Sequence, residues 1–181
     1  MLAKKVEASY SIGKVSIECL MIRSFNLKQK SYSREYALKY IYHLQLSPYQ
    51  QEKEQLIKSS DPLGDMAEQI ELFDESFSEI DSEHPDNKID LEIKSSANEL
   101  IRGTLTHEES LKNLIGPLLK GWTLERLDKI DLSLLLLGSF EIVYEKTPKG
   151  IVIDEVVRLA KKYGTKDSFS FINAVLDKIK A

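Results

Sequence analysis

The most constraining feature of this chain is an apolar segment at residues 131–144, DLSLLLLGSFEIVY, which is hydrophobic on nearly every side of a helix. A helix of this kind is typical of the centre of a helical protein, where neighbouring elements cover it all round. The apolar run is interrupted by Ser133, Ser139 and Glu141 and is too short to cross a bilayer. We therefore expect a buried central helix and no membrane span.

The rest of the chain has apolar residues at the three- and four-residue spacing of amphipathic helices, with no strand-like alternation after residue 30. Gly116 and Pro117 are expected to bend or end the longest helix, and Gly164 to follow the end of another. The sequence predicts an all-α fold, a compact bundle of about seven to eight helices. The expected helices cover residues 33–46, 52–58, 65–80, 91–119, 131–144 and 151–163, and a last helix that begins at Asp167 or Ser168 and has the apolar face Phe169, Ile172, Val175, Leu176 and Ile179.

The first expected helix lies in the segment SREYALKYIYHLQLS at residues 33–47, with Ser33 as its N-cap. Beside an ordinary apolar stripe it carries further aromatic and basic side chains: Tyr36, Lys39, Tyr40, Tyr42 and His43. Single-stranded RNA is bound by cations on its phosphates and by aromatic rings that stack on its bases. The segment therefore suits RNA binding, although tyrosines on a helix are more often half-buried packing residues. We expect Tyr36 and Tyr40 to be such packing residues.

The net charge of −4 is unevenly distributed. Residues 1–47 carry eight Lys and Arg against three Glu, a net charge of +5, so the remainder carries −9. A basic segment suits a polyanion and an acidic body suits a basic protein, although an acidic face can equally be a solvated surface. Residues 1–30 have no clear period and are expected to form a loosely ordered basic extension. We expect residues 1–20 to be an optional leader or a start-site artefact.

No motif for catalysis or cofactor binding is found in the sequence. The single cysteine, Cys19, excludes an internal disulfide and gives no sign of an oxidising compartment. The three histidines are scattered, and the chain has no HExxH, CxxC, GxGxxG, P-loop or GxSxG pattern. No secretory signal is visible either. We expect a cytoplasmic protein without catalytic activity, metal or cofactor.

Three segments resemble the NusB family of transcription antitermination factors. They are residues 33–47, quoted above, residues 100–144, and residues 153–179, IDEVVRLAKKYGTKDSFSFINAVLDKI. The last segment is the most specific, with LAKKYG, DS and FINAVLD in this order. The resemblance implies an all-helical protein of two packed lobes that binds boxA-type single-stranded leader RNA, notably of ribosomal RNA operons. It also implies a partner, the small-subunit ribosomal protein NusE, and a role in read-through of terminators by RNA polymerase, without catalytic activity or cofactor.

The resemblance carries over to particular positions of this chain. Residues 31–181 correspond to the NusB-like domain, with one lobe at about 31–88 and the other at about 89–181, and NusE is expected to dock around residues 91–119. Ser31 and Tyr32 stand where relatives often have Arg, and Ser170 where they usually have Lys or Arg, so the basic arm is diluted. The residues expected to contact RNA are Lys28, Lys30, Arg34, Tyr42, Asp167, Ser168 and Phe171.

Other functions remain open at this point. A diverged relative can keep the NusE surface and lose its RNA affinity, which makes it a protein-interaction module. A NusB-like fold also forms the RNA-binding domain of some ribosomal RNA cytosine methyltransferases, so the chain can serve as the RNA-binding subunit of a separate methyltransferase. A homodimer that hides the RNA face is compatible with the antitermination role.

Overall fold

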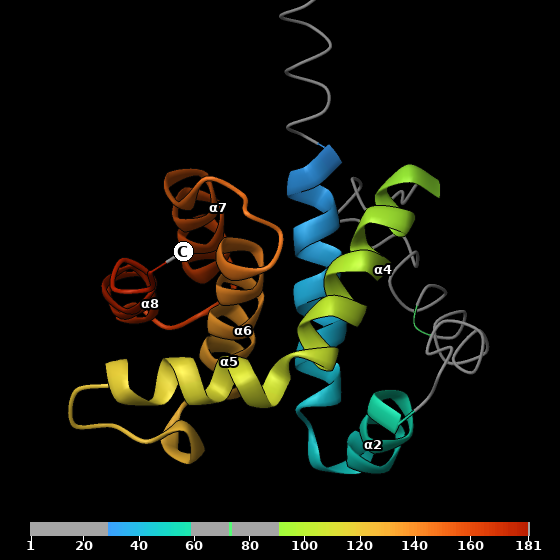
Figure 1. Ribbon diagram of the computed structural model, residues 1–181, viewed down its shortest axis with the longest axis horizontal. Coiled ribbons are helices and arrows are strands. Elements are labelled where there is room, and N and C mark those ends of the chain that lie inside the picture. Colours follow the sequence, from blue (N-terminus) through green and yellow to red (C-terminus); the bar gives the residue numbers. More distant parts are fainter. Residues whose placement is uncertain (1–28, 59–72, 74–90, 181) are drawn as a thin grey trace, which may run out of the picture.

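The computed structural model describes residues 29–58, 73 and 91–180, and this part of the chain contains helices, turns and bends but no strand (Figure 1). The predicted all-α fold is confirmed. No helix among the described residues is long and apolar enough to cross a membrane. The expected helix at 65–80 lies outside the described residues, apart from Phe73. In chain order the elements are a helix at residues 29–44, called the N-terminal helix below, η1 (Ser47–Tyr49), α2 (Gln50–Lys58), α4 (Leu91–Thr106), α5 (Glu108–Ile115), η2 (Gly116–Leu118), η3 (Leu124–Arg126), α6 (Lys129–Val143), α7 (Lys149–Tyr163) and α8 (Ser168–Leu176).

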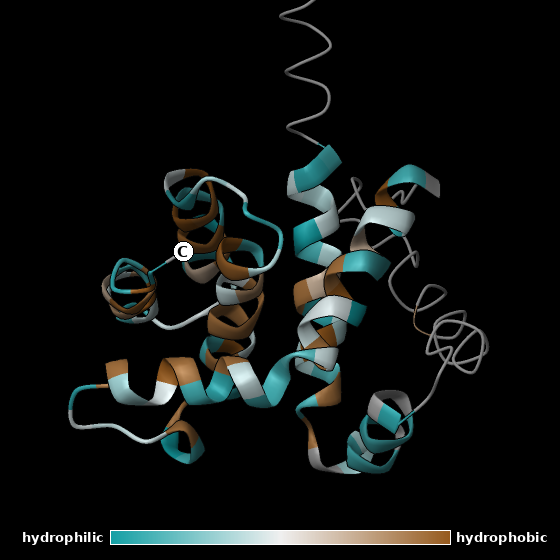
Figure 2. Ribbon diagram, in the orientation of Figure 1, coloured by the Kyte–Doolittle hydropathy of each residue, from teal (hydrophilic) through white to brown (hydrophobic). Residues whose placement is uncertain are grey.

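α6 is the centre of the bundle, as its sequence predicts. Every residue from Asp131 to Ile142 is buried, and α6 contacts α4, α5, α7 and α8. Figure 2 shows α6 as mainly hydrophobic among helices of mixed colour. Small residues let its neighbours approach closely: a Cβ on Gly138 would lie 3.0 Å from a methyl group of Leu176. The position of α8 against α6 depends on this close contact.

The prediction of one continuous helix over residues 91–119 is wrong in one respect, because the helix is broken at His107. α4 ends at Thr106 and α5 begins at Glu108, and α5 crosses the lower end of α4 in Figure 1. The His107 ring stacks on that of Tyr144 with 3.8 Å between ring centroids. Glu108 is buried and accepts a hydrogen bond from Lys53 of α2. These contacts with distant residues turn the chain here. The expected end at Gly116 is confirmed, since α5 ends at Ile115.

The N-terminal helix begins earlier than expected, so Ser33 is not its N-cap. Ser33 is buried within the helix, and its hydroxyl lies 3.0 Å from the carbonyl oxygen of Gln29 and 3.1 Å from that of Ile93 in α4. Figure 1 shows the N-terminal helix and α4 side by side. Tyr36 and Tyr40 are buried edge-to-face against the Phe73 ring, which confirms that both are packing residues.

The last two helices differ from expectation in detail. Asp167 is at the N-cap position of α8, but its side chain makes no capping hydrogen bond. Phe169, expected on the apolar face, is exposed, and α8 packs through Ile172, Val175 and Leu176. Gly164 ends α7 as expected, with an extended backbone. Glycine is needed there for space, because a Cβ would lie 2.6 Å from the Cβ of Ser168.

Gly103→Ala is expected to lower the free energy of unfolding by about 1–3 kcal/mol, the usual cost of overpacking a core. Gly103 lies where α4 crosses α6, and a Cβ there would lie 2.0 Å from Cζ of the Phe140 ring. Denaturant unfolding measures the effect. The matched control is Gly150→Ala in the first turn of α7, where a Cβ would have no atom within 4 Å. That variant is expected to gain up to about 1 kcal/mol through reduced backbone freedom in the unfolded chain. Equal stabilities of the two variants would contradict the close approach of α4 and α6.

Candidate nucleic-acid interface

A polar and aromatic stripe follows one side of the N-terminal helix. It consists of Tyr32, Glu35, Lys39 and Tyr42, spaced three or four residues apart, and is called the outer stripe below. Tyr32 and Tyr42 are exposed, and 37% of Tyr42 is accessible to solvent. The two rings thus bracket a carboxylate and a cation on the same side of one helix. Exposed aromatic rings next to charges are what a stacking surface for single-stranded nucleic acid requires.

The middle of the outer stripe faces the C-terminal half of α7. Lys162 Nζ donates to Glu35 Oε1 at 2.8 Å, the Tyr163 hydroxyl also donates to Glu35, and an Arg158 nitrogen lies 3.8 Å from the same carboxylate. Lys39 Nζ lies 5.6 Å from the centroid of the Tyr163 ring. Lys39, Arg158 and Lys162, called the basic cluster below, therefore surround one carboxylate. Both Arg158 and Lys162 remain exposed to solvent.

Electrostatics hold this arrangement together. Burial alone would raise the pKa of Glu35, but hydrogen bonds from Lys162 and Tyr163 and the charges of Lys162 and Lys39 hold that pKa below its ordinary value. Burial and the Glu35 carboxylate both raise the pKa of the Tyr163 hydroxyl, which therefore stays protonated and able to donate. Glu35 is thus an anion at neutral pH that orients two side chains of α7. Glu155 also lies 3.2 Å from Arg158, so the three cations face two carboxylates and leave one net positive charge on the surface.

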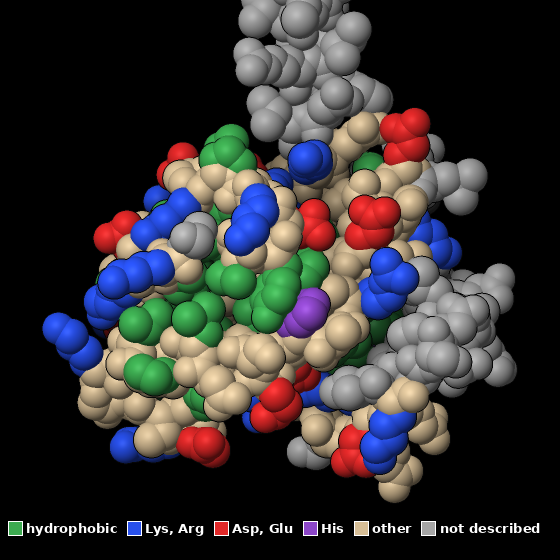
Figure 3. All heavy atoms as spheres, viewed as in Figure 1, with side chains coloured by type: hydrophobic (Ala, Val, Ile, Leu, Met, Phe, Trp, Pro, Cys, Tyr) green, Lys and Arg blue, Asp and Glu red, His purple; other side chains and the backbone are tan. Residues whose placement is uncertain are grey.

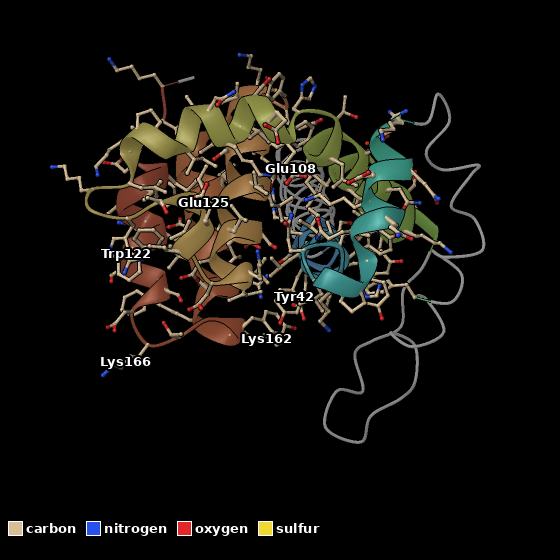
Figure 4. The ribbon with its side chains drawn as sticks, turned by 90° about the horizontal axis from the view of Figure 1, so that it is seen from below. Tyr42, Glu108, Trp122, Glu125, Lys162 and Lys166 are labelled. Atoms are coloured by element: carbon tan, nitrogen blue, oxygen red, sulfur yellow. The ribbon has the colours of Figure 1, made fainter. Side chains whose placement is uncertain are left out.

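The positive surface continues past the end of α7. Lys161 Nζ lies 5.4 Å from the centroid of the exposed Phe169 ring, and Lys166 is exposed in the turn before α8. In Figure 4 the labelled Tyr42, Lys162 and Lys166 follow one another along the lower edge of the view. Cations and aromatic rings therefore extend from the N-terminal helix to the start of α8.

An open groove of about 600 Å³ lies at the start of α8. Its walls come from the turn before α6, the first turn of α6 and the start of α8. The side chains that line it include Trp122, Arg126, Asp128, Asp131, Asp167 and Phe171. Three of the residues expected to contact RNA, Asp167, Ser168 and Phe171, thus line one groove together with the only tryptophan of the sequence.

The structure separates the expected RNA-contacting residues into two groups. Lys28 lies outside the described residues. Lys30, Tyr42 and Asp167 are exposed and Phe171 is half-buried, so each has surface to offer a ligand. Ser168 is buried, and its hydroxyl oxygen accepts a hydrogen bond from the Thr165 amide at 2.9 Å. This hydrogen bond holds the turn before α8, and the residue also lines the groove.

The expectation that Arg34 contacts phosphate does not fit its surroundings. Arg34 is 4% exposed, and its guanidinium donates through two nitrogens to both carboxylate oxygens of Glu141, at 2.7–2.9 Å. Glu141 is 3% exposed and belongs to the central helix α6. A guanidinium that is buried and neutralised in this way offers almost no accessible surface to RNA. Arg34 therefore connects the N-terminal helix to α6.

Sequence reasoning missed several residues of this surface. The outer stripe was visible in the 32, 35, 39 and 42 spacing, but Tyr32 was interpreted only as the loss of an arginine. Arg158 and Lys162 are four residues apart, which puts them on one face of α7. What the sequence does not show is that this face meets Glu35, a residue 127 positions away from Lys162.

The face shown in Figure 3 has a different character. Hydrophobic side chains gather there over α5 and α6, and Tyr144, at the end of α6, is exposed while it stacks on His107. This face includes part of the region expected to dock NusE. Among the described residues, no group of His, Cys, Asp and Glu could hold a metal ion.

Comparison with known proteins gives consistent results. The NusB family model matches residues 31–181. The transcription antitermination protein NusB of Thermodesulfovibrio yellowstonii is 35% identical over 149 residues, which cover 81% of this chain and 88% of that protein. The NusB protein of Macrococcus caseolyticus is 43% identical over 83 residues, which cover 46% of this chain and only 64% of that protein. The match to the Desulfitobacterium hafniense NusB protein spans 57% of its length.

Two solved structures share the fold. NusB of T. maritima superposes with a TM-score of 0.59 at 25% sequence identity, covering 82% of this chain and 88% of that chain. A chain in the crystal structure of a plectonemic RNA supercoil superposes with a TM-score of 0.61 at 25% identity, covering 82% of this chain and 91% of that chain.

Proposed function

This chain belongs to the NusB family, and from that premise we propose that it is a transcription antitermination factor that binds boxA-type leader RNA together with NusE. In this role it promotes read-through of terminators by RNA polymerase. Family membership supports the process and the partners. Within the molecule itself, the outer stripe beside the basic cluster is the observation that supports RNA binding.

Each part of this surface has a role in binding a single strand. The exposed rings of Tyr32 and Tyr42 offer flat faces on which unstacked bases can lie. Arg158 and Lys162 can bind phosphates, since their side chains are more than two-fifths exposed while they contact Glu35. Glu35 keeps these cations in place without neutralising all of them. We propose that the RNA runs along the outer stripe and past Lys161 and Lys166 to the start of α8.

Fluorescence anisotropy of a labelled boxA-type RNA, at several salt concentrations and with or without NusE, tests the proposal. We expect binding that weakens steeply with salt, because phosphate contacts release counterions, and that tightens when NusE is present. Failure to bind RNA under any of these conditions would overturn the proposal. If NusE still co-eluted with the chain on a sizing column, the protein-interaction module would be the correct reading.

Removal of two cations from the proposed path is expected to flatten the salt dependence of RNA binding. Each phosphate contact on a single strand contributes about 0.7 to the slope of the logarithm of the association constant against the logarithm of the salt concentration. The double variant Lys162→Ala, Lys166→Ala loses two such contacts, so its slope should become shallower by about 1.4. The control removes the same charge elsewhere, by Lys58→Ala in α2 and Lys178→Ala beyond α8, both at exposed positions. An equal change in slope for both double variants would mean that the overall charge, and not this path, governs binding.

A further inference from the structure

A small polar pocket of about 100 Å³ lies between the N-terminal helix, α4 and the connection from α6 to α7. Figure 1 shows this connection extending toward the N-terminal helix. The pocket has room for roughly three water molecules, at about 30 Å³ each, or for one molecule of similar total size. A nucleotide does not fit, so the pocket is not part of the proposed RNA path.

Arg34 and Glu141 form the buried wall of this pocket. The ion pair between them uses Nε and Nη2 of the guanidinium. The third nitrogen, Nη1, makes no hydrogen bond with a described residue, and it is not closed off from the pocket although Arg34 is only 4% exposed. Because guanidinium N–H groups can only donate, Nη1 requires an acceptor, and an anionic oxygen is the strongest one.

The outer part of the pocket carries charges of both signs. Lys30 of the N-terminal helix, Glu99 of α4 and Glu145 after α6 line it and are exposed. None of the three forms an ion pair within the described part of the chain. One cation and two carboxylates without partners therefore surround a cavity whose buried wall offers a further donor. Convergent polar groups in a preformed cavity are typical of a ligand site.

A ligand with a charge of one sign matches only part of this lining. A carboxylate alone would accept hydrogen bonds from Arg34 and Lys30, but it would face the two unpaired glutamates. An ammonium ion alone would satisfy the glutamates, but it would leave the guanidinium N–H groups opposite a cation. A zwitterion satisfies both sets, because its carboxylate accepts from the cations while its ammonium group donates to the glutamates.

We propose that this pocket binds a small zwitterion of the amino-acid class, glycine or a molecule of about its size. Its carboxylate accepts from Nη1 of Arg34 and from Lys30. Its ammonium group donates to Glu99 and Glu145. The small volume excludes a long side chain. The bound molecule connects three elements of the fold and therefore stabilises the folded protein by mass action. The inference is independent of the proposed function, since no RNA takes part in it.

Two-dimensional NMR of the isotope-labelled protein, titrated with glycine, tests the proposal. The backbone amide signals of Ser96, Glu145 and Thr147, which line the pocket, are expected to shift saturably. The dissociation constant should be on the order of 1 mM for so small a ligand. Acetate and methylamine each carry one of the two charges, and each should bind at least about tenfold more weakly, since it loses a charge-assisted contact. Betaine, whose trimethylated nitrogen has no N–H to donate, should cause no saturable shift.

Two results of these titrations would overturn the proposal. The first is acetate or methylamine binding as tightly as glycine, which would make the pocket a site for a single charge. The second is the absence of any saturable shift with glycine, which would leave the pocket to water.

Variants of the two glutamates test the ammonium side of the site. Glu99→Gln, Glu145→Gln removes both charges and should weaken glycine binding at least about tenfold. The control Glu109→Gln, Glu125→Gln makes the same change at exposed positions outside the pocket and should leave glycine binding unchanged. Equal losses in the two double variants would assign the effect to overall charge and contradict the site.

A variant of Arg34 tests the carboxylate side. Arg34→Lys keeps a cation beside Glu141 but has no second nitrogen to face the pocket, so glycine should bind at least about tenfold more weakly. A thermal melt confirms that this variant is folded, and the double glutamine variant carries the test if it is not. Undiminished glycine binding by folded Arg34→Lys would show that Nη1 does not bind the carboxylate and would overturn the inference.

Discussion

Replacing Arg34 with alanine is expected to lower the free energy of unfolding by about 3–5 kcal/mol, the usual cost of leaving a buried charge without its partner. Arg34 and Glu141 are both almost fully buried and are joined by three short hydrogen-bond contacts between the guanidinium and the carboxylate. Because the alanine variant keeps Glu141 in the core, the cost is larger than that of a surface pair. Denaturant unfolding followed by circular dichroism measures the loss.

Two companion variants keep this prediction testable even if the alanine variant does not fold. Arg34→Lys retains the charge but not the two-pronged geometry, so its loss of stability should be smaller than that of Arg34→Ala. The double variant Arg34→Met, Glu141→Leu removes both charges together, and its stability should return to near that of the wild type or exceed it. An Arg34→Ala variant as stable as the wild type would refute the buried ion pair.

The same variants test whether Arg34 affects RNA binding through the fold or through direct contact. If Arg34 acts only through the fold, the double variant should bind RNA as the wild type does, since the outer stripe and the basic cluster are unchanged. Direct contact with phosphate would instead leave the double variant folded but weak in binding, with a shallower salt dependence. The burial of Arg34 favours the first outcome.

Tyr42→Ala is expected to weaken RNA binding by about 1–3 kcal/mol, or roughly 5- to 150-fold in the dissociation constant, the usual contribution of one stacked base. Tyr42 is 37% exposed at the end of the outer stripe, so a large part of its ring is available to a base. The slope of log K against log salt concentration should not change, because stacking releases no counterions. Anisotropy titrations at matched salt concentrations measure both quantities.

Two control variants show whether the Tyr42 ring is the cause. Tyr42→Phe keeps the ring and should bind RNA nearly as well as the wild type. Tyr144→Ala removes an exposed tyrosine directly after α6, outside the proposed RNA path, and should leave RNA affinity unchanged. A loss in Tyr42→Phe as large as that in Tyr42→Ala would assign the effect to the hydroxyl group and contradict stacking.

Sequence periodicity was reliable wherever burial is decided within one helix. The apolar segment around Leu134 to Leu137 lies in a helix that is buried all round, and α6 and α7 begin within two residues of the expected positions. Periodicity was less reliable where a contact with a distant residue decides the local structure. The break at His107 is one example, since its cause is the stacking of His107 on Tyr144 and the burial of Glu108.

Only some residues of the candidate site could be predicted from the sequence. The resemblance and the spacing together pointed to Tyr42, Asp167 and Phe171, which retain accessible surface. Neither pointed to Trp122, Arg158 or Lys162, because a cation or an aromatic ring on a helix surface is ordinary until its neighbours are known. The groove is formed by residues from three separate segments, so no single stretch of sequence contains its pattern.

The sequence by itself determined the helical class, the central helix and the family of this protein, because each depends on residues close together in the chain. Only the tertiary structure decided which charged residues are surface and which are core. Arg34 looked like the end of a basic arm and Glu141 like an interruption of an apolar helix. The two form a buried pair across 107 residues of chain. The physical reason is that burying a charge costs much free energy unless an opposite charge meets it, and the spacing of residues along one helix does not show where that partner lies.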